Sequence, residues 1–223
     1  TGLYHALLGR GLASDVNGAY PRNDGSVGQL PMKEGTPLYN IYNTDAAWGA
    51  QWNLSQLWIL AYPEYMSEYI SSHLQAYKDA GWLADGLANN RYVSGVGTNL
   101  LSTIIAGAYE CGIRDFDTKT AYEACLKNEL EGKNRPFGAG KVNTTEFVKY
   151  GYVPHQDVGE GYHETFMFSA SHTLEYSYSA WAVAQWAKQL GDEAHYSQLM
   201  DLSKGWERLY DSSCNFIRPK KAD

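Results

Sequence analysis

The chain has 223 residues, enough to bury one sizeable hydrophobic core, and it carries a formal net charge of -7. No stretch is rich in Lys and Arg, so nucleic acid is not an expected partner. The longest apolar runs, such as residues 100–108, fall far short of the roughly 20 residues that cross a bilayer, which argues against a membrane partner. The three cysteines have no zinc-binding spacing and are too few for a disulfide framework, so no metal site is expected from them.

Apolar residues recur at helical spacing almost throughout the chain. The first apolar stripe runs from Leu3 to Leu12 and is followed by a loop rich in Gly, Pro, Asn and Asp over about 15–39. Further helices are expected at about 48–60, 63–78, 99–109, 117–130, 145–150, 171–190 and 193–210. No strand-like alternation of any length is visible.

Prolines and glycines mark several helix boundaries. Pro63 suits the first position of a helix that Gly81 ends, and Gly191 ends the long helix that begins near 171. Helices joined alternately by short and long loops predict an all-α chain of stacked antiparallel hairpins. A solenoid of the tetratricopeptide kind is the nearest alternative, but its fixed period is missing. A closed toroid of six hairpins needs about a dozen helices and about eight are expected here, so we predict one domain over 1–223 that forms part of an α/α toroid.

Glu175 is the candidate for catalysis that the sequence favours. A glutamate near a helix start most often stabilises the helix terminus, an electrostatic effect of about 0.3–1 kcal/mol. A capping box does not explain it, because the residue three before it is His172. Aromatic residues crowd the same stretch, and Tyr178 lies three residues on, along the same helix face. Such surroundings suit a glycosidase acid, which must keep its proton near neutral pH.

The residues around Glu175 resemble a known family motif. The run 173–178, Thr-Leu-Glu-Tyr-Ser-Tyr, followed by Trp181 and Ala184-Gln185, is similar to the S-K-T-L-E-Y-A-Y-D-D-W…A-Q segment of glycoside hydrolase family 92. Further stretches agree with that family in order and spacing, namely 13–20, 24–27, 81–83, 121–124, 150–154, 191, 210–211 and 216–219. The resemblance therefore covers essentially the whole chain as one colinear series.

The resemblance implies a fold and an activity. Members of the family pair a six-hairpin helical toroid with a β-sandwich, and they remove terminal α-mannose from glycans, as α-1,2-mannosidases do, with calcium and with inversion. The glutamate of T-L-E-Y is their general acid, which carries over to Glu175. The resemblance also implies a glycan substrate, a secreted or periplasmic address, and partner segments formed by the β-sandwich and the remaining toroid helices.

Four further residues are candidates for binding the sugar. The aspartate of the family's W-D-T carries over to Asp45, although its neighbours differ here. Trp48 lies close to Asp45 on the same helix, and Trp82 is kept from the family's G-W-L. Asn99 begins another helix, where the family's G-D-H reads Gly-Thr-Asn over 97–99. These departures leave the sugar and linkage open.

The sequence holds two competing alternatives. A toroid glycosidase for another sugar is one, and a non-catalytic helical module that binds carbohydrate or protein is the other. The family's catalytic base and most of its calcium ligands belong to segments that do not occur in this chain, so we expect calcium only in a full-length enzyme and no turnover by the isolated chain. A pit in which Glu175 and Asp45 converge among aromatic residues would favour the enzyme, whereas Glu175 on a convex surface would favour the binding module.

Overall fold

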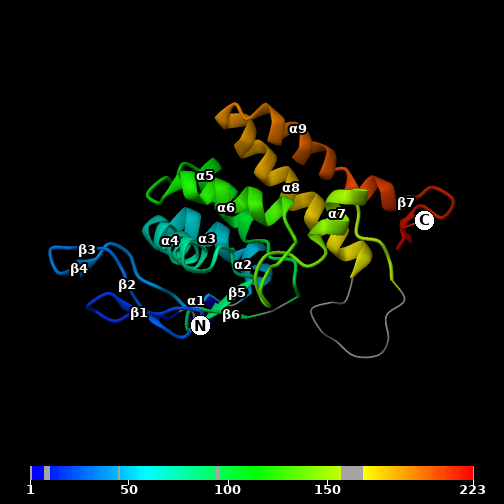
Figure 1. Ribbon diagram of the computed structural model, residues 1–223. Coiled ribbons are helices and arrows are strands. Elements are labelled where there is room, and N and C mark those ends of the chain that lie inside the picture. Colours follow the sequence, from blue (N-terminus) through cyan, green and yellow to red (C-terminus); the bar gives the residue numbers. More distant parts are fainter. Residues whose placement is uncertain (1, 8–10, 45, 94–95, 157–167, 223) are drawn as a thin grey trace.

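The computed structural model describes residues 2–7, 11–44, 46–93, 96–156 and 168–222. About half of this part of the chain is helical (Figure 1). The helices, in chain order, are α1 (Gly2–Leu7), α2 (Ala47–Gln51), α3 (Leu54–Ala61), α4 (Pro63–Ala80), α5 (Leu101–Glu110), α6 (Thr118–Leu130), α7 (Thr144–Tyr150), α8 (Ser169–Leu190) and α9 (Glu193–Leu202), followed by the 3-10 helix η1 (Gly205–Leu209). None of the described helices is long and apolar enough to cross a membrane.

The expected boundaries of the longest helices are confirmed. Pro63 is the first residue of α4, and Gly81 ends it in the left-handed conformation with φ 79°. Asp117 caps α6 by accepting a hydrogen bond from the Thr120 amide. Gly191 ends α8 with φ 72°. Residues with these backbone and capping properties therefore fixed the ends of the helices that carry the core.

Two expected helices are shorter than the apolar pattern predicted. The helix expected at 48–60 is divided into α2 and α3, because Asn53 leaves the helical conformation with φ -157°. The helix expected at 193–210 ends at Leu202 and gives way to η1. At Gly205 the chain passes the carbonyl oxygen of Gly151 so closely that a Cβ atom would lie 2.4 Å from it.

The expectation of a chain without strands is wrong for the described residues, which contain four short antiparallel hairpins beside the predicted helices. These pair β1 (Ala19–Pro21) with β2 (Val27–Gln29), β3 (Met32–Lys33) with β4 (Thr36–Pro37), β5 (Gly86–Ala88) with β6 (Arg91–Val93), and β7 (Tyr210–Asp211) with β8 (Phe216–Ile217). Asn89 and Asn90 join β5 to β6 with positive φ angles, as a tight hairpin turn requires. Strands of two or three residues are too short to show alternation in the sequence.

Helix α8 lies at the centre of the helical part of the chain. It packs against α5, α6 and α9, and Figure 1 shows α9 running alongside it while α5 and α6 lie toward the middle of the molecule. Small residues such as Ala180, Ala184 and Ala187 are buried along α8 and allow close approach of the neighbouring helices, and Trp186 is fully buried among them. The helix that carries Glu175 is thus one of the best-packed elements of the fold.

Candidate active site

Glu175 lies in the second turn of α8, because the helix begins at Ser169 rather than at the expected residue 171. No acidic residue occupies the first turn. The field of a helix terminus falls off within the first turn, so the helix start acts on Glu175 less than its expected position suggested. The electrostatic environment of the carboxyl group is therefore set mainly by the residues that contact it.

Trp48 is the neighbour that fixes the Glu175 carboxyl. Its indole Nε1 donates a hydrogen bond of 2.8 Å to Glu175 Oε1, which connects the start of α2 to α8 across 127 positions of sequence. The other carboxyl oxygen, Oε2, is buried and has no hydrogen-bond partner. A second contact joins the same two helices, because Gln51 Nε2 donates to the Tyr178 hydroxyl at 2.9 Å. The hydrogen bond to Oε1 thus orients the carboxyl group, while Oε2 has no hydrogen-bond partner.

A pocket of about 200 Å³ lies beside this carboxyl group. Its described lining combines aromatic walls with buried polar groups and consists of Trp48, Val96, Thr98, Phe168, Ser171, His172 and Glu175. The exposed Trp52 stands edge-on to Trp48, with ring centroids 6.1 Å apart, and extends the aromatic surface outward. Glu175 therefore lines a concave site rather than a convex surface, which is one half of the geometry that the enzyme hypothesis expected. Asp45, the other half, lies outside the described residues.

His172 and Thr98 belong to this pocket although the sequence did not single them out as site residues. His172 is buried, stacks on Tyr176, and places Nε2 3.2 Å from the Val96 carbonyl oxygen. Burial lowers its pKa to about 4, so its ring is neutral at neutral pH. Its position three residues before Glu175, on the same helix face, was the signal in the sequence that could have identified it.

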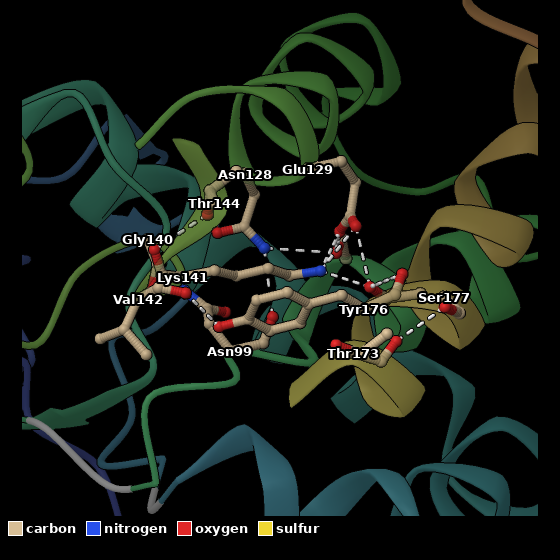
Figure 2. A network of polar contacts seen from close by, with 12 residues as sticks. Asn99, Asn128, Glu129, Gly140, Lys141, Val142, Thr144, Thr173, Tyr176 and Ser177 are labelled. Carbon is tan, nitrogen blue, oxygen red and sulfur yellow. Dashed lines mark hydrogen bonds and ion pairs between the residues drawn. The ribbon is translucent and has the colours of Figure 1, made fainter. Parts of the chain in front are cut away.

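A buried ion pair holds α8 one turn beyond Glu175 (Figure 2). Lys141 Nζ lies 2.6 Å from both carboxylate oxygens of Glu129, and each side chain is 1% exposed. Lys141 also donates to the Ser179 hydroxyl, and Ser179 donates to Glu129 at 2.8 Å. Burial lowers the pKa of Lys141, while the Glu129 carboxylate acts against that shift. Ser179 lies four residues after Glu175, so this network anchors the helix face that carries Glu175.

The same network connects α8 to the loops that flank the pocket. The Tyr176 hydroxyl lies within hydrogen-bond distance of the carbonyl oxygens of Gly97 and Val142, which share its single proton, and both contacts are buried. Figure 2 shows the Tyr176 ring lying alongside Lys141, whose Nζ is 5.0 Å from the ring centroid. The residue next to Glu175 therefore ties the loop that carries Thr98 to α8.

The other predicted sugar ligands are distributed differently. Asp45 lies outside the described residues. Trp82 does not line the pocket: it is 7% exposed and packs with Leu87, Tyr92 and other residues of a separate apolar cluster. Asn99 is fully buried, and its Nδ2 donates to the carbonyl oxygens of Leu83 and Gly140. The structure thus brings Trp48 to Glu175 and gives Trp82 and Asn99 packing and hydrogen-bonding roles elsewhere.

The family model of the glycosyl hydrolase family 92 catalytic domain matches residues 1–223. The chain belongs to glycosyl hydrolase family 92. An uncharacterized secreted glycosidase of Arthroderma benhamiae is 32% identical over 162 residues, which are 69% of this chain and 20% of that protein. The chain therefore spans about a fifth of the length of this curated relative.

Solved structures of the family share the fold. A family 92 α-mannosidase from Bacteroides thetaiotaomicron superposes with a TM-score of 0.81 at 22% identity, covering 98% of this chain and 27% of that one. Its complex with mannoimidazole gives a TM-score of 0.82 at 21% identity, over 98% of this chain and 26% of that one. A family 92 inverting mannosidase from the same organism gives 0.79 at 24% identity, over 99% and 28%. At these identities the likeness establishes the fold.

The described residues offer no group of three or more His, Cys, Asp or Glu side chains that could hold a metal ion. Ca²⁺ in proteins is bound by about six to eight oxygen ligands, many of them from Asp and Glu carboxylates. The described residues gather no such set of carboxylates and so do not form a calcium site by themselves.

Proposed function

We propose that the protein hydrolyses terminal α-mannosides with Glu175 as the general acid and with inversion at the anomeric carbon. The observation that carries this proposal is the carboxyl group of Glu175, bound by Trp48 through Oε1 and unpartnered at Oε2, beside an aromatic pocket in a chain of glycosyl hydrolase family 92. We take mannose as the sugar because the solved relatives are mannosidases, one of which is described as inverting.

The carboxyl geometry supports one position for the proton that the proposed acid transfers. The Trp48 N–H is a donor and Glu175 Oε1 accepts from it, so the acidic proton of Glu175 belongs on Oε2. This oxygen is free to donate to the glycosidic oxygen of a bound sugar. As the bond to the anomeric carbon breaks, the proton passes to the departing alcohol, which leaves neutral.

The base of the reaction lies outside the described pocket. An inverting enzyme places its second carboxylate roughly 6.5–9.5 Å from the acid, on the other side of a water molecule. Glu175 is the only carboxylate among the described lining residues. We infer that the base, together with any calcium ligands, belongs to another part of a longer polypeptide, since the solved relatives are about three and a half times as long as this chain. The isolated chain is expected to be inactive.

Glu175→Gln in the full-length protein tests the acid. The variant is expected to lose hydrolysis of methyl α-mannoside or mannose disaccharides by at least about a thousandfold, because their leaving groups need the proton. It is expected to retain much of its activity on an aryl α-mannoside with an acidic phenol, which leaves without protonation. Glu193→Gln, at the exposed start of α9, is the matched control and should behave as wild type. Full activity of Glu175→Gln on the disaccharides would refute the assignment.

We also propose that the protein acts outside the cytoplasm, a proposal that the secreted relative supports. A calcium requirement is proposed from the family resemblance only. Dialysis of the full-length enzyme against a chelator, followed by readdition of calcium or magnesium, tests it: activity that returns with calcium alone supports it, and activity that survives chelation contradicts it.

A further inference from the structure

Three buried polar atoms around the candidate active site have no hydrogen-bond partner. They are Thr98 Oγ1, His172 Nδ1 and Glu175 Oε2, and all three side chains line the pocket beside α8. Unpaired polar atoms inside a protein are destabilising and uncommon, because folding removes their water without replacing it. Three of them around one cavity indicate a ligand that supplies the missing partners.

His172 offers an acceptor to that ligand. Its Nε2 faces the Val96 carbonyl oxygen at 3.2 Å, and a carbonyl oxygen only accepts, so Nε2 carries the ring proton. In the neutral ring Nδ1 is then a lone-pair acceptor. Stacking on Tyr176 and edge contact with Phe168 hold the ring in this orientation. These contacts leave His172 Nδ1 without a partner, and as an acceptor it needs an O–H or N–H donor from a bound molecule.

Thr98 offers a hydroxyl whose position is fixed by the backbone on both sides. The amide of Gly97 donates to Asp85 Oδ2 at 3.3 Å, and the amide of Asn99 donates to Asp85 Oδ1 at 3.1 Å. One buried carboxylate therefore clamps the two residues that flank Thr98. A hydroxyl held in this way binds a ligand with little loss of conformational entropy.

The remaining lining indicates what kind of molecule carries these partners. Trp48 and Phe168 provide flat apolar surfaces, and none of the described lining residues is Lys or Arg. The cavity, at about 200 Å³, is smaller than the roughly 300–1,000 Å³ of sites for drug-sized ligands. An acceptor, a hydroxyl and an acid around one small aromatic cavity suit a single uncharged ring that bears several hydroxyl groups.

We propose that Thr98 and His172 bind hydroxyl groups of the sugar ring whose glycosidic oxygen Glu175 protonates, and that they make this pocket selective for a neutral pyranose over an anionic one. This proposal rests on the proposed glycosidase function but does not depend on the sugar being mannose. A uronic acid brings a carboxylate into a pocket whose described lining holds no Lys or Arg, and the nearby Lys141 is already paired with Glu129.

Binding of simple glycosides to the full-length protein tests the proposal without turnover. The probes are methyl α-mannopyranoside, methyl α-glucopyranoside and methyl α-mannuronoside, titrated by calorimetry into wild type and four variants. Thr98→Val removes the hydroxyl and His172→Phe removes both ring nitrogens, while each variant keeps the approximate shape of the side chain. Thr103→Val and His73→Phe are matched controls, since these buried residues also carry unpaired polar atoms but do not line this pocket.

We expect one neutral glycoside to bind, with Thr98→Val and His172→Phe each raising its Kd about 10-fold, both controls unchanged, and Thr98→Ser near wild type. The loss in each pocket variant should disappear for the deoxy form of the glycoside that lacks the hydroxyl bound by that residue. If glucoside binds and mannoside does not, the pocket assignment stands and the proposed mannosidase activity falls. Tighter binding of the mannuronoside, no binding of any neutral glycoside, or equal losses in pocket and control variants would overturn the inference.

Discussion

Trp48 and Glu175 stand 127 positions apart in the sequence and are joined by a 2.8 Å hydrogen bond between the indole Nε1 and one carboxyl oxygen. The contact brings the beginning of α2 to the second turn of α8. It occupies one oxygen of the carboxyl group and leaves the other, Oε2, without a partner. A single indole therefore both orients the Glu175 carboxyl group and forms a wall of the pocket beside it.

Trp48→Phe in the full-length enzyme tests this relationship. Phenylalanine keeps an aromatic wall but has no N–H, so the carboxyl group loses the donor that orients it. We expect kcat/KM to fall about 10- to 100-fold on poor leaving groups, because a misplaced acid transfers its proton less effectively. The loss should be smaller on activated aryl glycosides, which do not need the acid.

Trp52→Phe is the matched control for this variant. Trp52 is 54% exposed and touches Trp48 edge-on, but it makes no hydrogen bond to Glu175. Its substitution should change KM slightly and leave the ratio of rates on poor and activated leaving groups unchanged. Equal effects of the two substitutions on that ratio would show that the Trp48 hydrogen bond does not orient the acid.

Lys141→Met is expected to destabilise the fold strongly. The substitution leaves the Glu129 carboxylate buried, with Ser102 and Ser179 as its remaining partners. Breaking a buried ion pair from one side costs about 3–5 kcal/mol, whereas replacing both members by apolar residues costs much less. The double variant Glu129→Leu with Lys141→Met should therefore be more stable than Lys141→Met alone in urea unfolding at neutral pH.

Lys149→Met provides the comparison for a lysine on the surface. Lys149 is exposed on α7, and its loss should change the free energy of unfolding by less than about 0.5 kcal/mol. Similar losses for Lys141→Met and Lys149→Met would mean that the buried pair does not hold α8 in place.

The sequence predicted the helices whose ends have a local cause. Pro63, Gly81, Asp117 and Gly191 act on the backbone within one turn, and the structure confirms each boundary that they mark. The hairpin of β5 and β6 also has a local signal, because Asn89 and Asn90 both favour positive φ. That pair was missed since the strands beside it are only three residues long.

The site was predictable only in part, because its members meet through tertiary packing. The family motif predicts Glu175, and Trp48 is predicted from its place close to Asp45 on an expected helix. Lys141 lies between the helices expected at 117–130 and 145–150, and its burial depends on Glu129, which no local pattern connects to it. For His172 the sequence indicates only that its type rules out a capping box with Glu175. Its value to the site depends on Val96, 76 residues away.

His73 gives the chain a sensitivity to acid that is separate from the site. It is fully buried in α4, where it contacts Tyr69 edge-on, and neither ring nitrogen has a hydrogen-bond partner. Burial lowers its pKa from 6.5 to about 3. Between pH 6.5 and 3 the unfolded chain therefore binds a proton at His73 that the folded chain does not. The free energy of unfolding thus decreases as the pH falls through this range.

We expect His73→Leu to reduce this loss, because leucine fills a similar apolar space and does not titrate. Between pH 6 and 4 the stability of wild type should decrease relative to the variant by about 1.4 kcal/mol per pH unit, measured by urea unfolding at each pH. His172 contributes its own loss in both proteins and cancels in the difference. Leu74→Met, at the next position of the same helix, alters packing without a titratable group, so its curve should run parallel to that of wild type. Parallel curves for His73→Leu as well would show that His73 becomes protonated without unfolding the chain.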